Sequence, residues 1–325
     1  MQINRFPRVS LGFLPTPIHP LPNLSARLGG PDLWIKRDDQ TGLATGGNKT
    51  RKLEFLVGEA LAQECDTLIT IGAPQSNHAR QTAAAAAKAG LKSALVLRGT
   101  PPADRTGNIL IDDLIGAEVY WAGQRADAAA LNEVADELKA RGQKPYVIPL
   151  GGSNPIGALG YVTALQELVE QTKSIGVQFE AIVFATSSGG TQSGLVVGAQ
   201  LSGFTGRIVG ISVDHRASDY VPRLIDLAQA TADQIDPTSS FNAADFDVND
   251  HYLGGGYAVL GEPERKAIKL MAQTEGLLVD PVYTGRALAG LIDLIRQGEF
   301  KSNQKVLFWH TGGTPALFAY ARQLV

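Results

Sequence analysis

Cysteine is nearly absent from this chain of 325 residues, since Cys65 is the only one. A single thiol excludes an internal disulfide framework and a zinc site built on several cysteines. It also fits a protein of the reducing cytoplasm, which is where we expect the chain to act. Histidine is scarce as well, with 5 residues. No HExxH motif or other ligand spacing joins them, so we predict no metal site.

Neither sign of charge dominates the chain, which has 29 Lys and Arg residues against 32 Asp and Glu, a formal net charge of −3. This balance does not create the positive field that attracts nucleic acid or an anionic membrane. Long apolar runs are missing too. The longest uncharged stretch, Ala181 to Gly206, is interrupted by hydroxyl, amide and glycine residues at 186–193. We therefore expect neither nucleic acid nor a membrane as a partner.

Glycine is abundant, with 36 residues, and 44% of the chain is hydrophobic, as in a protein with a large buried core. Short β-branched runs alternate with segments of helical spacing, of which 51–63 and 75–89 are the clearest. This alternation predicts an α/β fold with open, mostly parallel sheets covered by helices on both faces. The predicted strands are Leu33–Lys36, Thr67–Ile71, Ser93–Leu97, Ala117–Trp121, Tyr146–Ile148, Ala181–Ala185, Arg207–Val213 and Lys305–Trp309.

The strand–helix alternation divides into two series, which predict two domains. We expect a smaller α/β domain at 51–160 and a larger domain formed by 1–50 and 161–325. Ligands of open α/β sheets bind beyond the carboxyl ends of the strands. The glycine clusters follow Ile71, Ile148, Ala185 and Trp309, at the ends of predicted strands. One cleft between the two domains is therefore expected to collect them.

The segment TGGNKTRK at 45–52 precedes a predicted helix and is similar to a phosphate loop. The Walker pattern fails, because Asn48 occupies the position that requires lysine. Lys49 is of interest for another reason. In a glycine-rich, apolar turn its amine would be desolvated, lose its proton and become a nucleophile for a carbonyl carbon. An exposed or ion-paired lysine is the alternative interpretation.

The segment SSGGTQSG at 187–194 follows the apolar run Ala181–Ala185 and precedes a helical pattern. A strand, then glycines with hydroxyl groups, then a helix start is the arrangement that binds a phosphate monoester. Backbone N–H groups and hydroxyls supply the hydrogen bonds, and the helix dipole favours the negative charge. A tight strand–helix turn without a ligand is the alternative.

Hydroxyl and amide side chains mark the remaining loops. QSNH at 75–78 follows a predicted strand, and Ser76 or Asn77 there is either a helix N-cap or part of a site for a substrate carboxylate. GGGY at 254–257, DPVYTG at 280–285 and HTGGT at 310–314 bring Tyr257, Tyr283 and Thr311 into similar loops. A tyrosine acts as a general acid or base when its pKa is lowered, for instance by a cation. Simple packing is the alternative for each.

Eight motifs follow one another along nearly the whole chain: LPTP (14–17), WIKRDD (34–39), GGNKTRKLEF (46–55), QSNHARQTA (75–83), GGSNPIGALGY (151–161), SSGGTQSGL (187–195), DPVYTG (280–285) and HTGG (310–313). In these motifs the chain resembles the D-cysteine desulfhydrase and 1-aminocyclopropane-1-carboxylate (ACC) deaminase family of fold type II pyridoxal-phosphate enzymes. The resemblance implies pyridoxal phosphate as cofactor, a small amino acid as substrate, a larger cofactor-binding domain and a homodimer.

The resemblance also implies a role for each matching position. Lys49 would bind the cofactor covalently, Asn77 would hydrogen-bond its phenolic oxygen, and Thr311 would lie near its pyridine nitrogen. The phosphate would be held by Lys52, Ser188, Gly189, Gly190 and Thr191. The substrate carboxylate would lie at the helix start formed by Ser76, Asn77 and His78. The catalytic groups around the reacting carbons would be Lys49, Ser76, Tyr257 and Tyr283.

Thr284 guides the choice of substrate within the family. ACC deaminases typically have Glu directly after the tyrosine of DPVY, where it contacts the pyridine nitrogen, but here that residue is Thr284. We therefore expect α,β-elimination of D-cysteine to pyruvate, hydrogen sulfide and ammonia. L-cysteate sulfo-lyase and ACC deaminase activities are the alternatives, and D-serine or β-chloro-D-alanine could also be accepted. A non-catalytic cofactor-binding module is the alternative outside the enzymes.

Overall fold

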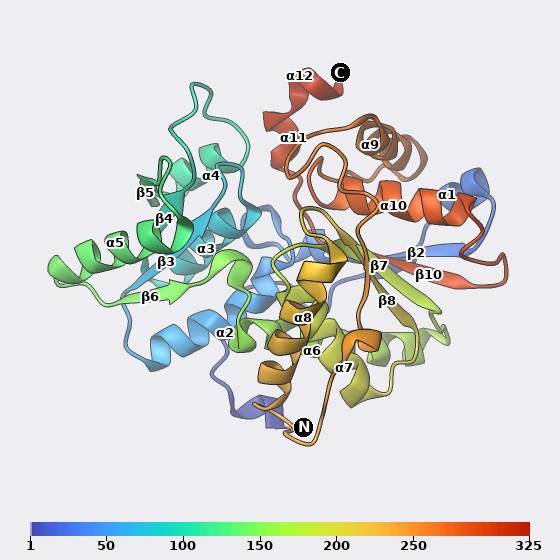
Figure 1. Ribbon diagram of the computed structural model, residues 1–325, viewed down its shortest axis with the longest axis horizontal. Coiled ribbons are helices and arrows are strands. Elements are labelled where there is room, and N and C mark those ends of the chain that lie inside the picture. The colour runs from blue at the N-terminus through green and yellow to red at the C-terminus, as the bar shows by residue number, and fades with distance from the viewer. Residues whose placement is uncertain (1) are drawn as a thin grey trace.

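The computed structural model describes residues 2–325, which form two β-sheets with helices packed against them (Figure 1). The six-stranded sheet has the order β1-β2-β10-β7-β8-β9, and the four-stranded sheet has the order β5-β4-β3-β6. Neighbouring strands are parallel except β1 and β2. The bounds are β1 Ile18–Pro20, β2 Asp32–Arg37, β3 Thr67–Gly72, β4 Lys92–Leu97, β5 Glu118–Trp121, β6 Pro145–Ile148, β7 Ala181–Thr186, β8 Arg207–Ser212, β9 Asp247–Asn249 and β10 Lys305–His310.

All the strands expected from the sequence are present within one residue at each end. Two strands were not predicted from the sequence, β1 and β9, which are three residues long and pair with only one neighbour each. Neither has the apolar pattern of a buried strand, because β1 contains His19 and Pro20 and β9 reads Asp-Val-Asn. A proline is tolerated at such an edge position, since it donates no hydrogen bond to a ladder.

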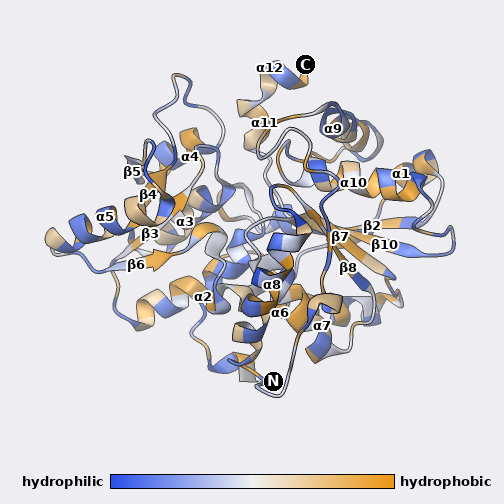
Figure 2. Ribbon diagram, in the orientation of Figure 1, coloured by the Kyte–Doolittle hydropathy of each residue, from blue (hydrophilic) through white to orange (hydrophobic). Residues whose placement is uncertain are grey.

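Helices cover both faces of the six-stranded sheet. In β7, Ile182 and Phe184 pack with α6, α7 and α8, whereas Val183 and Ala185 pack with α9 and α10. Burial on both faces explains why this strand reads as a continuous apolar run. In Figure 2 the middle strands of this sheet are mainly hydrophobic, while α5 alternates between hydrophilic and hydrophobic segments.

The helices are bounded as follows: α1 Pro22–Leu28, α2 Lys49–Ala62, α3 Asn77–Ala89, α4 Asn108–Ile115, α5 Asp127–Ala140, α6 Pro155–Ile175, α7 Gly190–Ser202, α8 Ala217–Ala232, α9 Glu262–Glu275, α10 Thr284–Arg296, α11 Ala316–Ala319 and α12 Ala321–Leu324. Within residues 2–325, no helix combines the length and the apolar character needed to cross a bilayer. The uncharged stretch that begins at Ala181 forms β7 and α7.

The two sheets draw on different parts of the chain. All strands of the four-stranded sheet lie between 67 and 148, whereas β1 and β2 join the strands after residue 181 in the other sheet. The exact domain boundaries at 50/51 and 160/161 stay a prediction. The loops that follow β3, β4, β6, β7, β8 and β10 all contribute residues to one pocket.

Candidate active site

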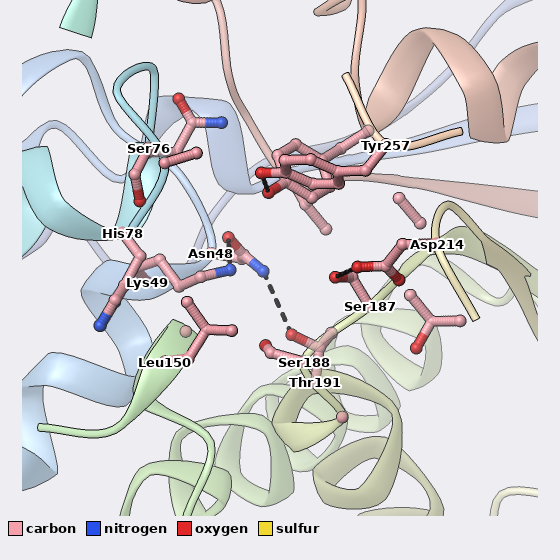
Figure 3. A pocket seen from close by; sticks show the side chains of 18 of the residues that line it. Asn48, Lys49, Ser76, His78, Leu150, Ser187, Ser188, Thr191, Asp214 and Tyr257 are labelled. Carbon is pink, nitrogen blue, oxygen red and sulfur yellow. Dashed lines mark hydrogen bonds between the residues drawn. The ribbon is translucent and has the colours of Figure 1, made fainter. Parts of the chain in front are cut away.

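One pocket contains most of the side chains singled out from the sequence (Figure 3). Its walls come from the first turns of α2 and α3 on one side and from the loops after β7, β8 and β10 on the other. The predicted residues that line it are Lys49, Ser76, Asn77, His78, Ser188, Gly189, Thr191, Tyr257, Tyr283 and Thr311. Lys52 and Gly190 do not line this pocket, but they contact groups directly behind its wall.

Lys49 is the first residue of α2, and a strained turn places it in the pocket. Gly46 has φ of +72°, and a Cβ there would lie 2.0 Å from the carbonyl oxygen of Asp39, so only glycine fits. The next turn is fixed by a hydrogen bond from the Asn48 N–H to the carbonyl of Thr311 (2.9 Å) at the end of β10. The helix therefore begins beside the carboxyl end of β10, an inner strand of the six-stranded sheet.

The amine of Lys49 loses its proton more readily than an exposed lysine does. Burial, followed by the positive charge of Arg80, lowers its pKa to about 8 against the opposing effect of Asp280. Lys49 Nζ donates a hydrogen bond to Oδ1 of Asn48 (3.0 Å), which holds the amine beside the pocket centre (Figure 3). The nucleophilic lysine expected from the sequence thus has the burial that such chemistry requires, and among residues 2–325 it has no ion-pair partner.

Lys52 is a fully buried cation whose hydrogen-bond acceptors are neutral. Its Nζ donates to the carbonyl of Gly151 (3.0 Å) and to Oγ of Ser153 (3.1 Å). Burial and the nearby charge of Lys49 hold its pKa well below the usual value. No ion pair of Lys52 occurs within the part of the chain described, so an anion bound here would supply the missing negative charge.

Ser153 connects Lys52 to the start of α7. Its Oγ lies 2.8 Å from Oγ of Ser188 and accepts the N–H of Gly190 (3.1 Å). A Cβ on Gly190 would lie 2.9 Å from both Lys52 Nζ and Ser153 Oγ, so a larger residue would fill this space. A cation, two hydroxyls and the first amide of a long helix are the donors that a phosphate monoester requires, and the residues present therefore fit the phosphate of pyridoxal phosphate.

Ser76 is the N-cap of α3, because its Oγ accepts the N–H of Ala79 (3.1 Å). The N-cap interpretation is therefore confirmed, and the same residue also lines the pocket. The next two amides, of Asn77 and His78, occupy the first turn of the helix and have no acceptor within it. Together with the helix dipole, they form a position suited to a carboxylate.

His78 is neutral and its ring points away from this helix start. Thr70 Oγ1 donates its proton to the carbonyl of Ile148 (2.8 Å). Because that proton is used, the contact of 2.8 Å between Thr70 Oγ1 and His78 Nε2 is one in which the ring N–H donates and Thr70 accepts. Burial, followed by the charges of Lys49 and Lys52, holds the imidazole pKa well below its usual value. The side chain of His78 is therefore no cation for a substrate, and only its backbone amide is available for that purpose.

Tyr257 and Tyr283 lie against each other in the pocket wall. Their hydroxyl oxygens are 2.5 Å apart, and their rings meet edge to face with centroids 6.0 Å apart. Burial raises the pKa of both phenols, and Tyr257 raises that of Tyr283 further. The lowered pKa considered from the sequence is therefore wrong for these residues. Both remain protonated near neutral pH and can donate a proton.

Thr284 does not line the pocket. Its hydroxyl is fully buried and bonded to Asp280, donating to Oδ1 (2.7 Å) and accepting the backbone N–H of the same residue (2.7 Å). Thr311, by contrast, lies in the pocket wall at the end of β10. The position after the DPVY tyrosine thus supplies no carboxylate to the pocket.

Several polar residues of the site were not predicted from the sequence. Asn48 donates from Nδ2 to Oγ1 of Thr191 (3.1 Å), and Ser187 donates to Oδ2 of Asp214 (2.8 Å), as Figure 3 shows. Asp214 follows the predicted strand β8, so its position at a carboxyl end was an available signal. Ser153 belongs to the GGSNPIG motif, but nothing local to that motif indicates a contact with α7.

Comparisons with known proteins agree with this geometry. A family model described as "Pyridoxal-phosphate dependent enzyme" matches residues 9–312. D-cysteine desulfhydrase from Klebsiella pneumoniae (strain 342) is 46% identical over 324 residues, covering 98% of this chain and 97% of that protein. The crystal structure of an ACC deaminase homologue matches with a TM-score of 0.91 and 42% identity, over 99% of this chain and 96% of that one.

A more distant structure, a fungal L-serine ammonia-lyase from Rhizomucor miehei, matches with a TM-score of 0.70 over 97% of both chains. At 19% identity it supports the fold alone. The family match, the near-full-length relatives and a pocket whose residues fit the cofactor lead to one conclusion: the chain belongs to the pyridoxal-phosphate dependent enzymes of fold type II.

Proposed function

We propose that this enzyme is a D-cysteine desulfhydrase, which converts D-cysteine and water to pyruvate, hydrogen sulfide and ammonia. The observation that carries the proposal is the 46% identity to D-cysteine desulfhydrases over 98% of the chain. The pocket supports it, because Lys49, the phosphate-binding groups and the tyrosine pair lie in or directly behind the wall of one cavity.

The cofactor supplies the electron sink: when bound, pyridoxal phosphate withdraws electrons from Cα of the substrate and so permits loss of the α-proton and of the leaving group on Cβ. Lys49 would bind it through the neutral amine, Asn77 would donate to its phenolic oxygen, and Thr311 would lie near its pyridine nitrogen. The phosphate would be held by Lys52, Ser188, Gly189, Gly190 and Thr191.

The start of α3 orients the substrate. The amides of Asn77 and His78 bind its carboxylate at the positive end of the helix. The amine of Lys49 would move protons at Cα, and Ser76 lies on the same side of the pocket as Lys49 (Figure 3). This arrangement would hold the scissile bond in place.

The tyrosine pair protonates the leaving thiolate. Tyr283 is buried and keeps its proton at neutral pH. The hydroxyl oxygens of Tyr283 and Tyr257 lie 2.5 Å apart and share a hydrogen bond. A proton donor at this position converts the departing thiolate to hydrogen sulfide and so prevents its return. The shared hydrogen bond allows Tyr257 to stabilise charge that develops on Tyr283.

ACC deaminase is the second candidate, favoured by the 0.91 TM-score of the ACC deaminase homologue. Ring opening of ACC has no thiolate leaving group and so requires a stronger electron sink, which a carboxylate at the pyridine nitrogen would provide. Thr284 supplies none, because its hydroxyl is bonded to Asp280 outside the pocket. The absence of a carboxylate from this position favours D-cysteine.

Turnover of D-cysteine by the purified holoenzyme tests the proposal. We expect sulfide and pyruvate in equal amounts, and no release of either by a Lys49→Ala variant. The matched control is Lys266→Ala, since this lysine is exposed on α9 and far from the pocket lining. Absence of sulfide from the parent enzyme would contradict the proposal.

We infer that the protein is a cytoplasmic homodimer. Each chain would have a smaller domain, 51–160, and a larger domain formed by 1–50 and 161–325. Support comes from the family, whose members are usually homodimers, and from the single cysteine. Light scattering of the purified protein measures the mass in solution, and the mass of one chain would contradict a dimer.

A further inference from the structure

Helix α4 begins with a fully buried asparagine that contacts the first residue of α3. The Nδ2 group of Asn108 donates to Oδ1 of Asn77 (3.0 Å) and to the backbone carbonyl of Gln75 (2.9 Å). Asn77 lines the pocket, whereas Asn108 does not. Asn108 is therefore placed to act on the site only through its neighbour.

These contacts fix which way each amide faces. A backbone carbonyl can only accept, so the group of Asn108 that faces Gln75 must be the NH₂. The same NH₂ faces Asn77, which must then present its oxygen to Asn108. Among residues 2–325, Nδ2 of Asn77 has no hydrogen-bond acceptor. The amide of Asn77 is thus left with its N–H donors free for a ligand.

Gln75 holds Asn108 in place, and hydrogen bonds to the backbone fix the orientation of Gln75 in turn. Its Oε1 accepts the backbone N–H of Asn108 (2.8 Å), and its Nε2 donates to the carbonyl of Thr106 (2.9 Å). A backbone N–H can only donate and a carbonyl can only accept, so the orientation of Gln75 is fixed by the backbone at both ends. The chain of amides is therefore anchored to the loop that leads into α4.

We propose that Asn108 is a positioning residue that sets the orientation of the Asn77 amide, so that Asn77 presents an N–H and not an oxygen to the phenolic oxygen of pyridoxal phosphate. This inference rests on the role proposed above for Asn77. An acceptor at that position would repel the negative charge of the phenolic oxygen, whereas a donor stabilises it.

The absorption bands of the bound cofactor test this directly, because their balance reports the charge of the phenolic oxygen. We expect Asn108→Ala to lower the ratio of the charged to the neutral phenolic form, read from the two bands of the holoenzyme, roughly tenfold at fixed pH. This is the size of one hydrogen bond to a charged group. We expect Asn77→Ala to lower the same ratio. In the double variant the effect is no larger than in Asn77→Ala alone, because both substitutions remove one interaction.

The controls separate this inference from a general loss of structure. Asn132→Ala removes an exposed asparagine from α5 and leaves the bands unchanged. If Asn108→Ala fails to fold, Asn108→Asp keeps the shape of the side chain but has no donor, and it is measured instead.

Two results would overturn the inference. One is a parent-like spectrum of the Asn108 variant beside an altered Asn77→Ala spectrum, and the other is additive effects in the double variant. If the spectra follow expectation but D-cysteine releases no sulfide, the proposed function fails and the inference stands.

Discussion

In the proposed role of Lys49, its charge state decides how readily the cofactor attaches. Only the neutral amine attacks the carbonyl carbon of pyridoxal phosphate, and burial lowers the Lys49 pKa to about 8. The neutral fraction increases as the pH rises through that value. We expect the rate of cofactor binding to the cofactor-free protein to rise about tenfold between pH 7 and a plateau above pH 9. Stopped-flow absorbance measures it, and a rate that is flat or falls over this range would contradict the assignment.

Tyr283 is expected to contribute at the chemical step and not to cofactor binding. Tyr283→Phe removes the proton donor and leaves the ring, so we expect kcat for D-cysteine to fall by about 10²-fold or more. The cofactor absorption band should remain, since this residue holds neither phosphate nor phenolic oxygen. Tyr146→Phe, in β6 and outside the pocket lining, is the matched control. Unchanged turnover in the first variant would remove Tyr283 from the mechanism.

Many individual residues of the site could be predicted from the sequence, because they belong to motifs at the ends of strands. The contacts between motifs could not. Asn48 meets Thr191 across 143 positions of the chain, and Lys52 meets Ser153 across 101. Such pairs depend on how the two sheets are placed. The same holds for the raised pKa values of the tyrosines, which follow from burial that no local pattern reports.

At the scale of elements, α2 is held by a buried charge network that begins two residues after Lys49. Arg51 bonds Asp38 (2.8 and 2.9 Å) and Glu167 (2.9 Å), and Tyr161 donates to Asp38 (2.6 Å). Burial alone would raise the pKa of Asp38, but Arg51 and its neighbours lower it to about 2. Both ions are therefore present in the folded protein at neutral pH, and the network fixes α2 against β2 and α6.

Removing one partner of this network leaves an unpaired buried charge. We expect Arg51→Met to lower the free energy of unfolding by about 3–5 kcal/mol, measured by urea denaturation at pH 7. Arg125→Met, which breaks an exposed pair with Glu133, is the matched control and should change it by less than about 1 kcal/mol. Equal effects of the two substitutions would show that the network does not stabilise α2.

The elements themselves were predictable where burial imposes a pattern. β7 reads as an apolar run because both of its faces are covered, and α3 shows a helix-forming run at Ala83–Ala87. The short edge strands β1 and β9 bury little and have no such pattern. The start of α2 at Lys49, two residues before the predicted start, depends on the contact between Asn48 and Thr311 in a distant loop.

At the scale of the whole molecule, the cofactor is expected to connect elements of both sheets. The phosphate-binding groups come from α2, the loop after β6 and the start of α7, so a bound phosphate stabilises all three together. At about 100 times its Kd, pyridoxal phosphate should add about 2.7 kcal/mol to the free energy of unfolding. Pyridoxal, which lacks the phosphate, is the control and should add much less. Equal stabilisation by both compounds would contradict the assignment of the phosphate site.

One assay tests most directly whether this enzyme eliminates sulfide from D-cysteine. Pyruvate, sulfide and sulfite are measured in parallel with D-cysteine, L-cysteine, L-cysteate and ACC as substrates. We expect pyruvate with an equal amount of sulfide from D-cysteine, at a kcat/KM far above that for the other three. Pyruvate with sulfite from L-cysteate, or ACC consumed faster than D-cysteine, would contradict the claim and show that Thr284 is a poor guide to the substrate.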